Sequence, residues 1–332
     1  MGSSAAKSPP LAPEFEAAFR ARADPDGTMS FDRFMELALY HPQLGYYRRG
    51  QTRVGREPGT DFFTSTSSGP LFGELVTAAS VKRLRAAGRD PTAHTWVEIG
   101  AEPGGNGVLT GVPHPFRSVQ TIRLGEPVVL TGECIVFSNE LFDAQPCLRH
   151  VVRRGRWWEL GVTLRDGNLV EVELDSDVIR EPTVRAPEGY HFDQPLAAAA
   201  LADEIAGQPW RGLFLAFDYG KTFQELAQAT PGGTARAYYR HTQSNDLLAR
   251  PGEQDLTCHV CWDWIAAALT RHGFGSPELD FQESFLIHQA GEVIAAISAA
   301  EAAQTSPRKR ALMQLLHGGH MGQKFQVLHA LR

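Results

Sequence analysis

The sequence predicts a mixed α/β fold built around a doubly wound, mostly parallel sheet. Three short apolar segments have the length expected of buried strands, and each ends in or runs into an acidic residue, Glu98, Glu140 or Asp218. In open α/β sheets, ligands bind outside the carboxyl ends of the strands. These segments, at residues 95–99, 134–138 and 212–217, therefore predict both the sheet and the edge that carries a site.

Other elements are predicted around this core. Residues 31–40 place Phe31, Phe34 and Leu39 on one helical face, with Ser30 as a candidate N-cap. Alternation of period two across residues 151–174, with Arg-Gly and Asp-Gly turn signals, predicts an antiparallel meander inserted in the sheet domain. Further helices are predicted at 71–87, 195–206, 262–272, 289–303 and 308–316, and further strands at 119–124, 281–288 and 324–329.

Three regions follow from this order. Residues 1–13, rich in Ser, Ala and Pro, are expected to form a flexible leader, and residues 14–90 an N-terminal helical and lid region. Residues 91–332 are expected to form a Rossmann-like domain with an insertion at about 151–210.

Composition narrows the functional class. The 332 residues are 42% hydrophobic and 21% charged, the balance of a globular protein, and the net charge of -6 argues against binding to nucleic acid. No apolar run reaches the roughly 18 residues of a membrane span. With four cysteines and no secretory signal, we expect a cytoplasmic protein. Cys258 and Cys261 have zinc-like spacing but lack a second ligand pair nearby, so no metal site is predicted.

A glycine-rich turn follows the first predicted strand. In W-V-E-I-G-A-E-P-G-G-N-G-V, residues 96–108, Gly100 and Gly104 allow a tight turn close to a ligand, and Glu98 could accept hydrogen bonds from it. Such turns also occur for purely structural reasons. Glu102 and Pro103 stand where a glycine and a free amide are expected, and the full spacing of a dinucleotide-binding dehydrogenase is absent.

Taken together, the segments resemble the MidA-like S-adenosylmethionine-dependent methyltransferases, a family that includes mitochondrial complex I assembly factors. The resemblance spans most of the chain. It rests on Leu39-Tyr40-His41-Pro42 with Gly45-Tyr46-Tyr47, Asp61-Phe62-Phe63-Thr64-Ser65, Phe72-Gly73, Glu98-Ile99-Gly100-Ala101, Asn139-Glu140-Leu141-Phe142-Asp143-Ala144, Asp218-Tyr219-Gly220, Gly233-Thr234 with Arg236-Ala237-Tyr238, Pro251-Gly252-Glu253-Gln254-Asp255 with Thr257 and His259, and Met321-Gly322 before Phe325. It implies a class I methyltransferase fold with a seven-stranded sheet whose last strand is antiparallel. It also implies S-adenosylmethionine as the cofactor and arginine in a protein as the leading acceptor.

The resemblance assigns roles to several side chains. Glu140 and Asp143, with Asn139 as an orienting amide, would position a guanidinium, which pairs bidentately with carboxylates. The alternative is an ordinary helix N-cap. The cofactor would be held by Glu98, Gly100, Glu102, Gly104 and Glu126, under a lid formed by Asp61, Phe62, Thr64 and Ser65; an ordinary turn is the alternative for the lid.

A second set of residues is expected on the substrate side. Asp218 and Tyr219 would line the substrate mouth, and Arg236, His241, Asp255 and His259 would form a polar cluster. His259 is a candidate base because an unperturbed imidazole titrates near neutrality, although such a histidine is more often only hydrogen bonded to its neighbours.

Two departures from the family pattern leave two hypotheses open. Glu102 replaces the usual glycine and would place a carboxylate near that of the cofactor. The interval 104–139 is short and leaves Glu126 as the candidate for binding the ribose hydroxyls. The chain is therefore an active methyltransferase or a catalytically impaired relative that serves as a binding or assembly module.

Overall fold

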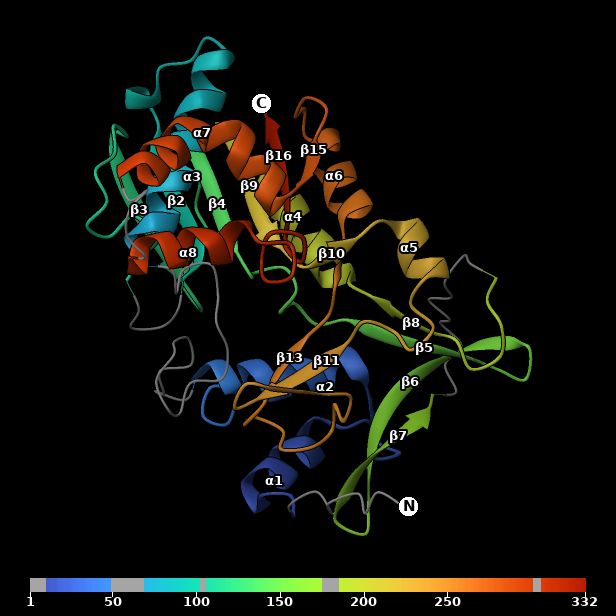
Figure 1. The fold of residues 1–332 in the computed structure, drawn as a ribbon. Helices are drawn as coiled ribbons and strands as arrows, with labels where there is room; N and C mark the ends of the chain where they lie inside the picture. Colours follow the sequence, from blue (N-terminus) through green and yellow to red (C-terminus); the bar gives the residue numbers. More distant parts are fainter. Residues whose placement is uncertain (1–9, 49–68, 102–105, 175–184, 301–305) are drawn as a thin grey trace.

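The computed structural model describes residues 10–48, 69–101, 106–174, 185–300 and 306–332. Its two parts lie one above the other in Figure 1. The upper part holds an α/β sheet with its helices, and the lower part holds an antiparallel sheet with the N-terminal helices. The carboxyl ends of the parallel strands point toward the lower part.

The main sheet has six strands among the described residues, in the order β15-β16-β9-β4-β2-β3. Their bounds are β2 (Thr95–Ala101), β3 (Ser118–Arg123), β4 (Gly132–Asn139), β9 (Trp210–Asp218), β15 (Glu278–Phe281) and β16 (Gln326–Leu331). The pairs β3-β2, β2-β4 and β4-β9 are parallel, whereas β16 is antiparallel to both of its neighbours. The described sheet thus differs from the seven-stranded sheet expected above.

Helices cover both faces of this sheet, as the doubly wound prediction requires. α3 (Pro70–Ala86), α7 (Gln282–Ala300) and α8 (Pro307–Leu316) pack on one face, and α4 (Leu196–Gly207) and α6 (Trp262–Arg271) on the other. Alternate residues of β4 serve the two cores: Ile135 and Phe137 pack with α3 and α7, whereas Cys134 and Val136 pack with α4 and α6. Successive side chains of β4 point to opposite faces of the sheet, and both faces are buried. The sequence of this strand is therefore continuously hydrophobic.

The lower part confirms the predicted meander and extends it. β5 (Leu148–Arg153), β6 (Arg156–Arg165) and β7 (Asn168–Glu173) form the predicted antiparallel run. Two unpredicted strands join it: β8 (His191–Gln194) pairs with β5, and β1 (Thr28–Ser30) with β6. The N-terminal chain is therefore part of the same sheet.

Two N-terminal helices pack with this second sheet. α1 (Pro13–Arg22) precedes β1, and α2 (Phe31–Tyr40) has the predicted bounds. Ser30 occupies the predicted N-cap position with an extended backbone, but its hydroxyl bonds Asp32 and makes no capping hydrogen bond. The remaining elements are η1 (Tyr46–Arg48), η3 (Pro91–Ala93), β10 (Gly220–Lys221), α5 (Phe223–Gln228), β11 (Arg236–Tyr239), β12 (Thr242–Ser244), β13 (Asp255–Thr257) and β14 (Val260–Cys261).

The predicted strand at 281–288 is wrong. β15 ends at Phe281, and α7 begins at Gln282. Phe285 and Leu286 are fully buried while Ile287 is 51% exposed, which is a helical pattern that a short apolar run conceals. The Gln282 side chain donates a hydrogen bond to the Leu315 carbonyl oxygen at 3.0 Å and thereby links α7 to α8.

The short interval 104–139 still contains a strand of the main sheet, β3. Residues 106–117, between β2 and β3, and residues 124–131, between β3 and β4, contain no helix. Because β2 and β3 pair in parallel, the carboxyl end of β3 lies beside that of β2. None of the helices in the described ranges is long and apolar enough to cross a membrane.

Candidate active site

A cavity of about 510 Å³ lies at the carboxyl ends of β2, β3 and β4, where the two parts of the molecule meet. Its size is within the range of small-molecule sites. Its apolar lining residues include Ile99, Ile122, Leu124, Val128 and Leu201. Its acidic and aromatic lining residues include Tyr40, Tyr47, Glu140, Asp143, Tyr219, Tyr238 and Asp255.

The glycine turn is closed by Glu98. Its Oε2 accepts a hydrogen bond from the Val108 amide at 2.8 Å, so this buried carboxylate ties the returning chain to β2. A Cβ at Gly107 would lie 2.8 Å from the same oxygen, and glycine allows this close approach. Burial raises the pKa of Glu98 to about 7, while the Val108 amide and Arg123 oppose the rise. Glu98 therefore shapes the loop and also lines the cavity.

Gly100 leaves space at the cavity wall. Its φ of 86° is in the left-handed region, and a Cβ would lie 2.8 Å from Leu141 Cδ1. A side chain at this position would therefore be strained and would press on another wall residue. Glu102 and Gly104, predicted beside it, lie outside the described residues, as do the lid candidates Asp61, Phe62, Thr64 and Ser65.

Glu126 lies just after β3 and lines the cavity. Its Oε2 accepts a hydrogen bond from the Arg123 amide at 2.7 Å, and the Glu126 amide donates to the Arg123 carbonyl oxygen at 3.0 Å. This tight turn holds an exposed carboxylate at the carboxyl end of the strand, where an acid for ribose hydroxyls was expected.

The loop after β4 carries Asn139, Glu140 and Asp143 into the cavity. No helix begins in this described stretch, so the alternative of an ordinary N-cap is wrong. Glu140 has a left-handed φ of 52°, and its amide donates to the Phe217 carbonyl oxygen at 3.0 Å. Asn139 Nδ2 donates to Glu140 Oε1 at 3.0 Å and so orients that carboxylate.

The buried Asp218 carboxylate holds this loop by hydrogen bonds to its backbone. Its Oδ2 accepts hydrogen bonds from the amides of Phe142 at 2.9 Å and Asp143 at 3.4 Å, and its Oδ1 accepts from the Tyr219 amide at 2.8 Å. Asp218 is fully buried and does not line the cavity, so its predicted place at the substrate mouth is wrong. Tyr219, the next residue, does line the cavity.

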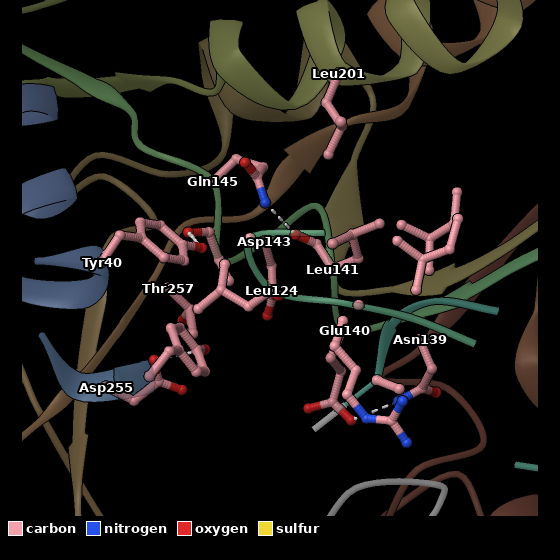
Figure 2. A pocket seen from close by; sticks show the side chains of 18 of the residues that line it. Tyr40, Leu124, Asn139, Glu140, Leu141, Asp143, Gln145, Leu201, Asp255 and Thr257 are labelled. Carbon is pink, nitrogen blue, oxygen red and sulfur yellow. Dashed lines mark hydrogen bonds between the residues drawn. The ribbon is translucent and has the colours of Figure 1, made fainter. Parts of the chain in front are cut away.

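Asp143 lies between Asp255 and Glu140 in the view of Figure 2. Burial, followed by the negative charges of Asp218, Glu140 and Asp255, raises the pKa of Asp143 well above its usual range. The pKa values of the phenols of Tyr40 and Tyr219 are also raised, by burial and by neighbouring carboxylates. This group of carboxylates therefore favours a cation, and the hydroxyls of Tyr40 and Tyr219 line the same cavity.

The second predicted polar cluster is only partly assembled. Asp255 and His259 line the cavity, whereas Arg236 and His241 do not. Arg236 Nη1 donates to the Ala235 carbonyl oxygen at 2.6 Å, and His241 is exposed in the turn between β11 and β12. Burial, aided by Lys221 and Arg236, lowers the pKa of His259 to about 4, so this imidazole is neutral at physiological pH.

Several wall residues were not predicted from the sequence as site residues. Tyr40 and Tyr47 come from the N-terminal part, and Tyr238 and Thr257 from β11 and β13. The repeated tyrosines at 40, 46 and 47 were part of the family resemblance but carried no spacing that indicates a role. In the described ranges, no group of three or more His, Cys, Asp or Glu side chains is arranged to hold a metal ion.

Comparison with known proteins agrees with this geometry. Residues 116–277 match a family model described as "Putative S-adenosyl-L-methionine-dependent methyltransferase". "Protein arginine methyltransferase NDUFAF7, mitochondrial" from Danio rerio is 25% identical over 299 residues, which cover 72% of this chain and 68% of that protein. A crystal structure from Burkholderia thailandensis, described as a "likely methyl transferase" bound to S-adenosyl-homocysteine, is 26% identical, has a TM-score of 0.84 and covers 98% of this chain and 95% of its own. These comparisons support a MidA-like S-adenosylmethionine-dependent methyltransferase family for this chain.

The fold of this methyltransferase has further support. A second Burkholderia thailandensis structure is 24% identical, with a TM-score of 0.80 and coverage of 98% of this chain and 95% of its own. The chain is an S-adenosylmethionine-dependent enzyme of this α/β class, and the alternative of an impaired binding module is not favoured.

The cavity of the methyltransferase fits the cofactor. Ile99, Ile122 and Val128 offer an apolar slot for an adenine ring, and the Glu126 carboxylate is placed to accept bonds from ribose hydroxyls. Gly100 keeps the wall beside them clear. S-adenosylmethionine, when bound, supplies a methyl group carried on a sulfonium.

Proposed function

We propose that this methyltransferase modifies a protein side chain and that the acceptor is arginine. The observation that carries the proposal is the group of three carboxylates, Glu140, Asp143 and Asp255, that line the cavity close to one another. The Danio rerio relative is named a protein arginine methyltransferase, which supports the same acceptor.

The carboxylates suit a guanidinium. Its planar fork of five donors can bond two carboxylates at once, and it is more weakly hydrated than a lysine ammonium, so burying it costs less. In the low-dielectric surroundings of Asp143, pairing with a cation offsets the mutual repulsion of the neighbouring carboxylates.

The same residues can assist the chemistry. An attacking nitrogen gains a methyl group and loses a proton, and a carboxylate in contact with it can accept that proton. Asn139 fixes the Glu140 carboxylate, and Asp218 fixes the backbone of the loop. Holding the acceptor nitrogen in line with the methyl group can contribute several kcal/mol, because the reacting atoms are already aligned.

Methyl transfer to matched peptides tests this function. Peptides that contain either one arginine or one lysine are incubated with the enzyme and with methyl-labelled S-adenosylmethionine, and the hydrolysed product is analysed for methylated amino acids. We expect label in methylarginine and at least a 100-fold loss of kcat in Glu140→Gln, with S-adenosylhomocysteine affinity kept within about twofold. Label in methyllysine, or full activity of Glu140→Gln, would contradict the proposal.

A further inference from the structure

The N-terminal part of the chain contributes a wall of the cavity beside the carboxylates. α2 ends at Tyr40 and η1 contributes Tyr47, and the two rings stack with centroids 5.5 Å apart and an interplanar angle of 21°. Tyr46 packs edge-on against Tyr47 at 5.2 Å from inside the N-terminal core. The Tyr47 ring is therefore packed on two sides, by Tyr40 and by Tyr46.

This wall contacts both segments that carry the carboxylates. The Tyr47 hydroxyl donates a hydrogen bond to Asp255 Oδ1 at 2.9 Å. The Tyr40 hydroxyl donates to the Ala144 carbonyl oxygen at 2.7 Å, next to Asp143 in the loop after β4. Two phenols from one short stretch of chain thus fix the distance between the Asp143 loop and β13.

Asp255 is placed to bind a ligand. It is 4% exposed, lines the cavity, and lies on β13 opposite Tyr238 of β11. The negative charge of Asp255 contributes to the raised pKa values of Tyr40, Tyr47 and Asp143, so these groups share one electrostatic environment. A buried carboxylate that lines a cavity is stabilised by a ligand of positive charge.

Asp255 and Glu140 belong to different elements. Glu140 follows β4 in the main sheet, whereas Asp255 belongs to the small sheet β12-β11-β13. Figure 2 shows them on either side of Asp143. A planar cation with donors on two edges can reach both sides, whereas a compact ammonium directs its donors from a single nitrogen.

We infer that Asp255, anchored by Tyr47, is the specificity-determining carboxylate of the acceptor subsite: it binds the edge of a guanidinium remote from Glu140 and selects arginine over lysine. The inference rests on the proposed function and deepens it. It gives the N-terminal wall a part in substrate choice, in addition to closing the cavity.

Two variants of the full chain test the subsite. Tyr47→Phe keeps the ring and removes the hydrogen bond to Asp255, and Asp255→Asn removes the charge. We expect KM for an arginine peptide to rise about 5- to 20-fold in Tyr47→Phe and at least as much in Asp255→Asn, as for loss of a hydrogen bond to a charged group. Both variants should keep S-adenosylhomocysteine affinity within about twofold, and Asp255→Glu should recover part of the loss.

Tyr190→Phe is the matched control. The Tyr190 hydroxyl is buried, donates to the Leu226 carbonyl oxygen at 2.9 Å and accepts from the Thr230 amide at 3.1 Å, but Tyr190 does not line the cavity. This variant should be destabilised at least as much as Tyr47→Phe, because it also leaves the Thr230 amide without its acceptor, and should keep the wild-type KM. An equal rise of KM in both tyrosine variants would point to loosened packing and would overturn the subsite.

Competition by methylguanidinium and methylammonium separates the subsite from the proposed function. NMR titration in the presence of S-adenosylhomocysteine requires no turnover. Tighter binding of methylguanidinium by the wild type, with its preference lost in Asp255→Asn, supports the subsite even if no arginine peptide is methylated. Methylation of arginine with an unchanged KM in both cavity variants would overturn the subsite and leave the proposed function standing.

Discussion

Asp218 accepts a hydrogen bond from the Phe142 amide at 2.9 Å and so carries the loop that presents Glu140 and Asp143 to the cavity. The two residues are separated by 76 positions, and the bond joins the carboxyl ends of two neighbouring parallel strands, β4 and β9. Burial raises the pKa of Asp218 to about 7, while the amides that donate to it oppose the rise. This carboxyl group is thus a structural support of the site.

Asp218→Asn should damage both the fold and the reaction. One oxygen of the amide still accepts a bond, but its NH2 group faces a backbone amide, so one buried donor loses its partner at a cost of about 1–3 kcal/mol. We expect this loss in urea unfolding and at least a tenfold fall in kcat/KM. Asp203→Asn is the control, since Asp203 pairs with Arg271 at the surface and should change stability by less than about 1 kcal/mol. Equal stability of the two variants would argue against the supporting role.

Gly100→Ala should weaken cofactor binding. The new Cβ would lie 2.8 Å from Leu141 Cδ1, at the cavity wall, in a left-handed backbone conformation. We expect S-adenosylhomocysteine affinity to fall about tenfold in calorimetry. Gly167→Ala is matched in strain, because Gly167 has a φ of 74° but open space around it. Both variants should lose about 1 kcal/mol of stability, and only the first should lose affinity.

Glu98 should make the fold less stable as the pH rises. Its folded pKa of about 7 exceeds the ordinary value of 4.5, so the native state holds a proton that the unfolded chain has lost between these pH values. The full stability present below pH 4.5 is therefore reduced progressively up to about pH 7, by at most about 3 kcal/mol. Glu98→Gln keeps an acceptor for the Val108 amide and should flatten this part of the profile. Urea unfolding at pH 5 and pH 8 measures the difference, and parallel profiles for the two proteins would contradict it.

Acceptor binding should release protons near neutral pH. The raised pKa values of Asp143 and Asp218 mean that protons occupy the cluster on the acid side, and a cationic substrate prefers the deprotonated form. We expect kcat/KM for an arginine peptide to rise from about pH 6 to pH 8, with proton release in calorimetry across buffers of different ionisation enthalpy. His259→Gln should keep the same pH profile, because His259 is already neutral in this range. A profile lost in that variant would assign the titration to His259 instead.

Local sequence patterns determined most of the framework. α2 has its predicted bounds because its apolar residues repeat at helical spacing. The strand predicted at 134–138 is found as β4, because burial of both faces requires a continuous apolar run. The residues after β4 indicated a site because the carboxyl end of a parallel strand opens toward ligands. The strand prediction for 281–288 was wrong, since a short apolar run at a strand-to-helix junction is compatible with both strand and helix periodicity.

Only the tertiary structure decided which acids touch the cavity and which support it. Asp143 and Asp218 both follow apolar strands, yet the first lines the cavity and the second lies buried beneath the loop. The bond between Tyr47 and Asp255 spans 208 positions and exists only because the N-terminal part packs against β11 and β13. Spacing along a chain encodes which face of an element is buried, but the contact between two distant side chains depends on how whole elements pack.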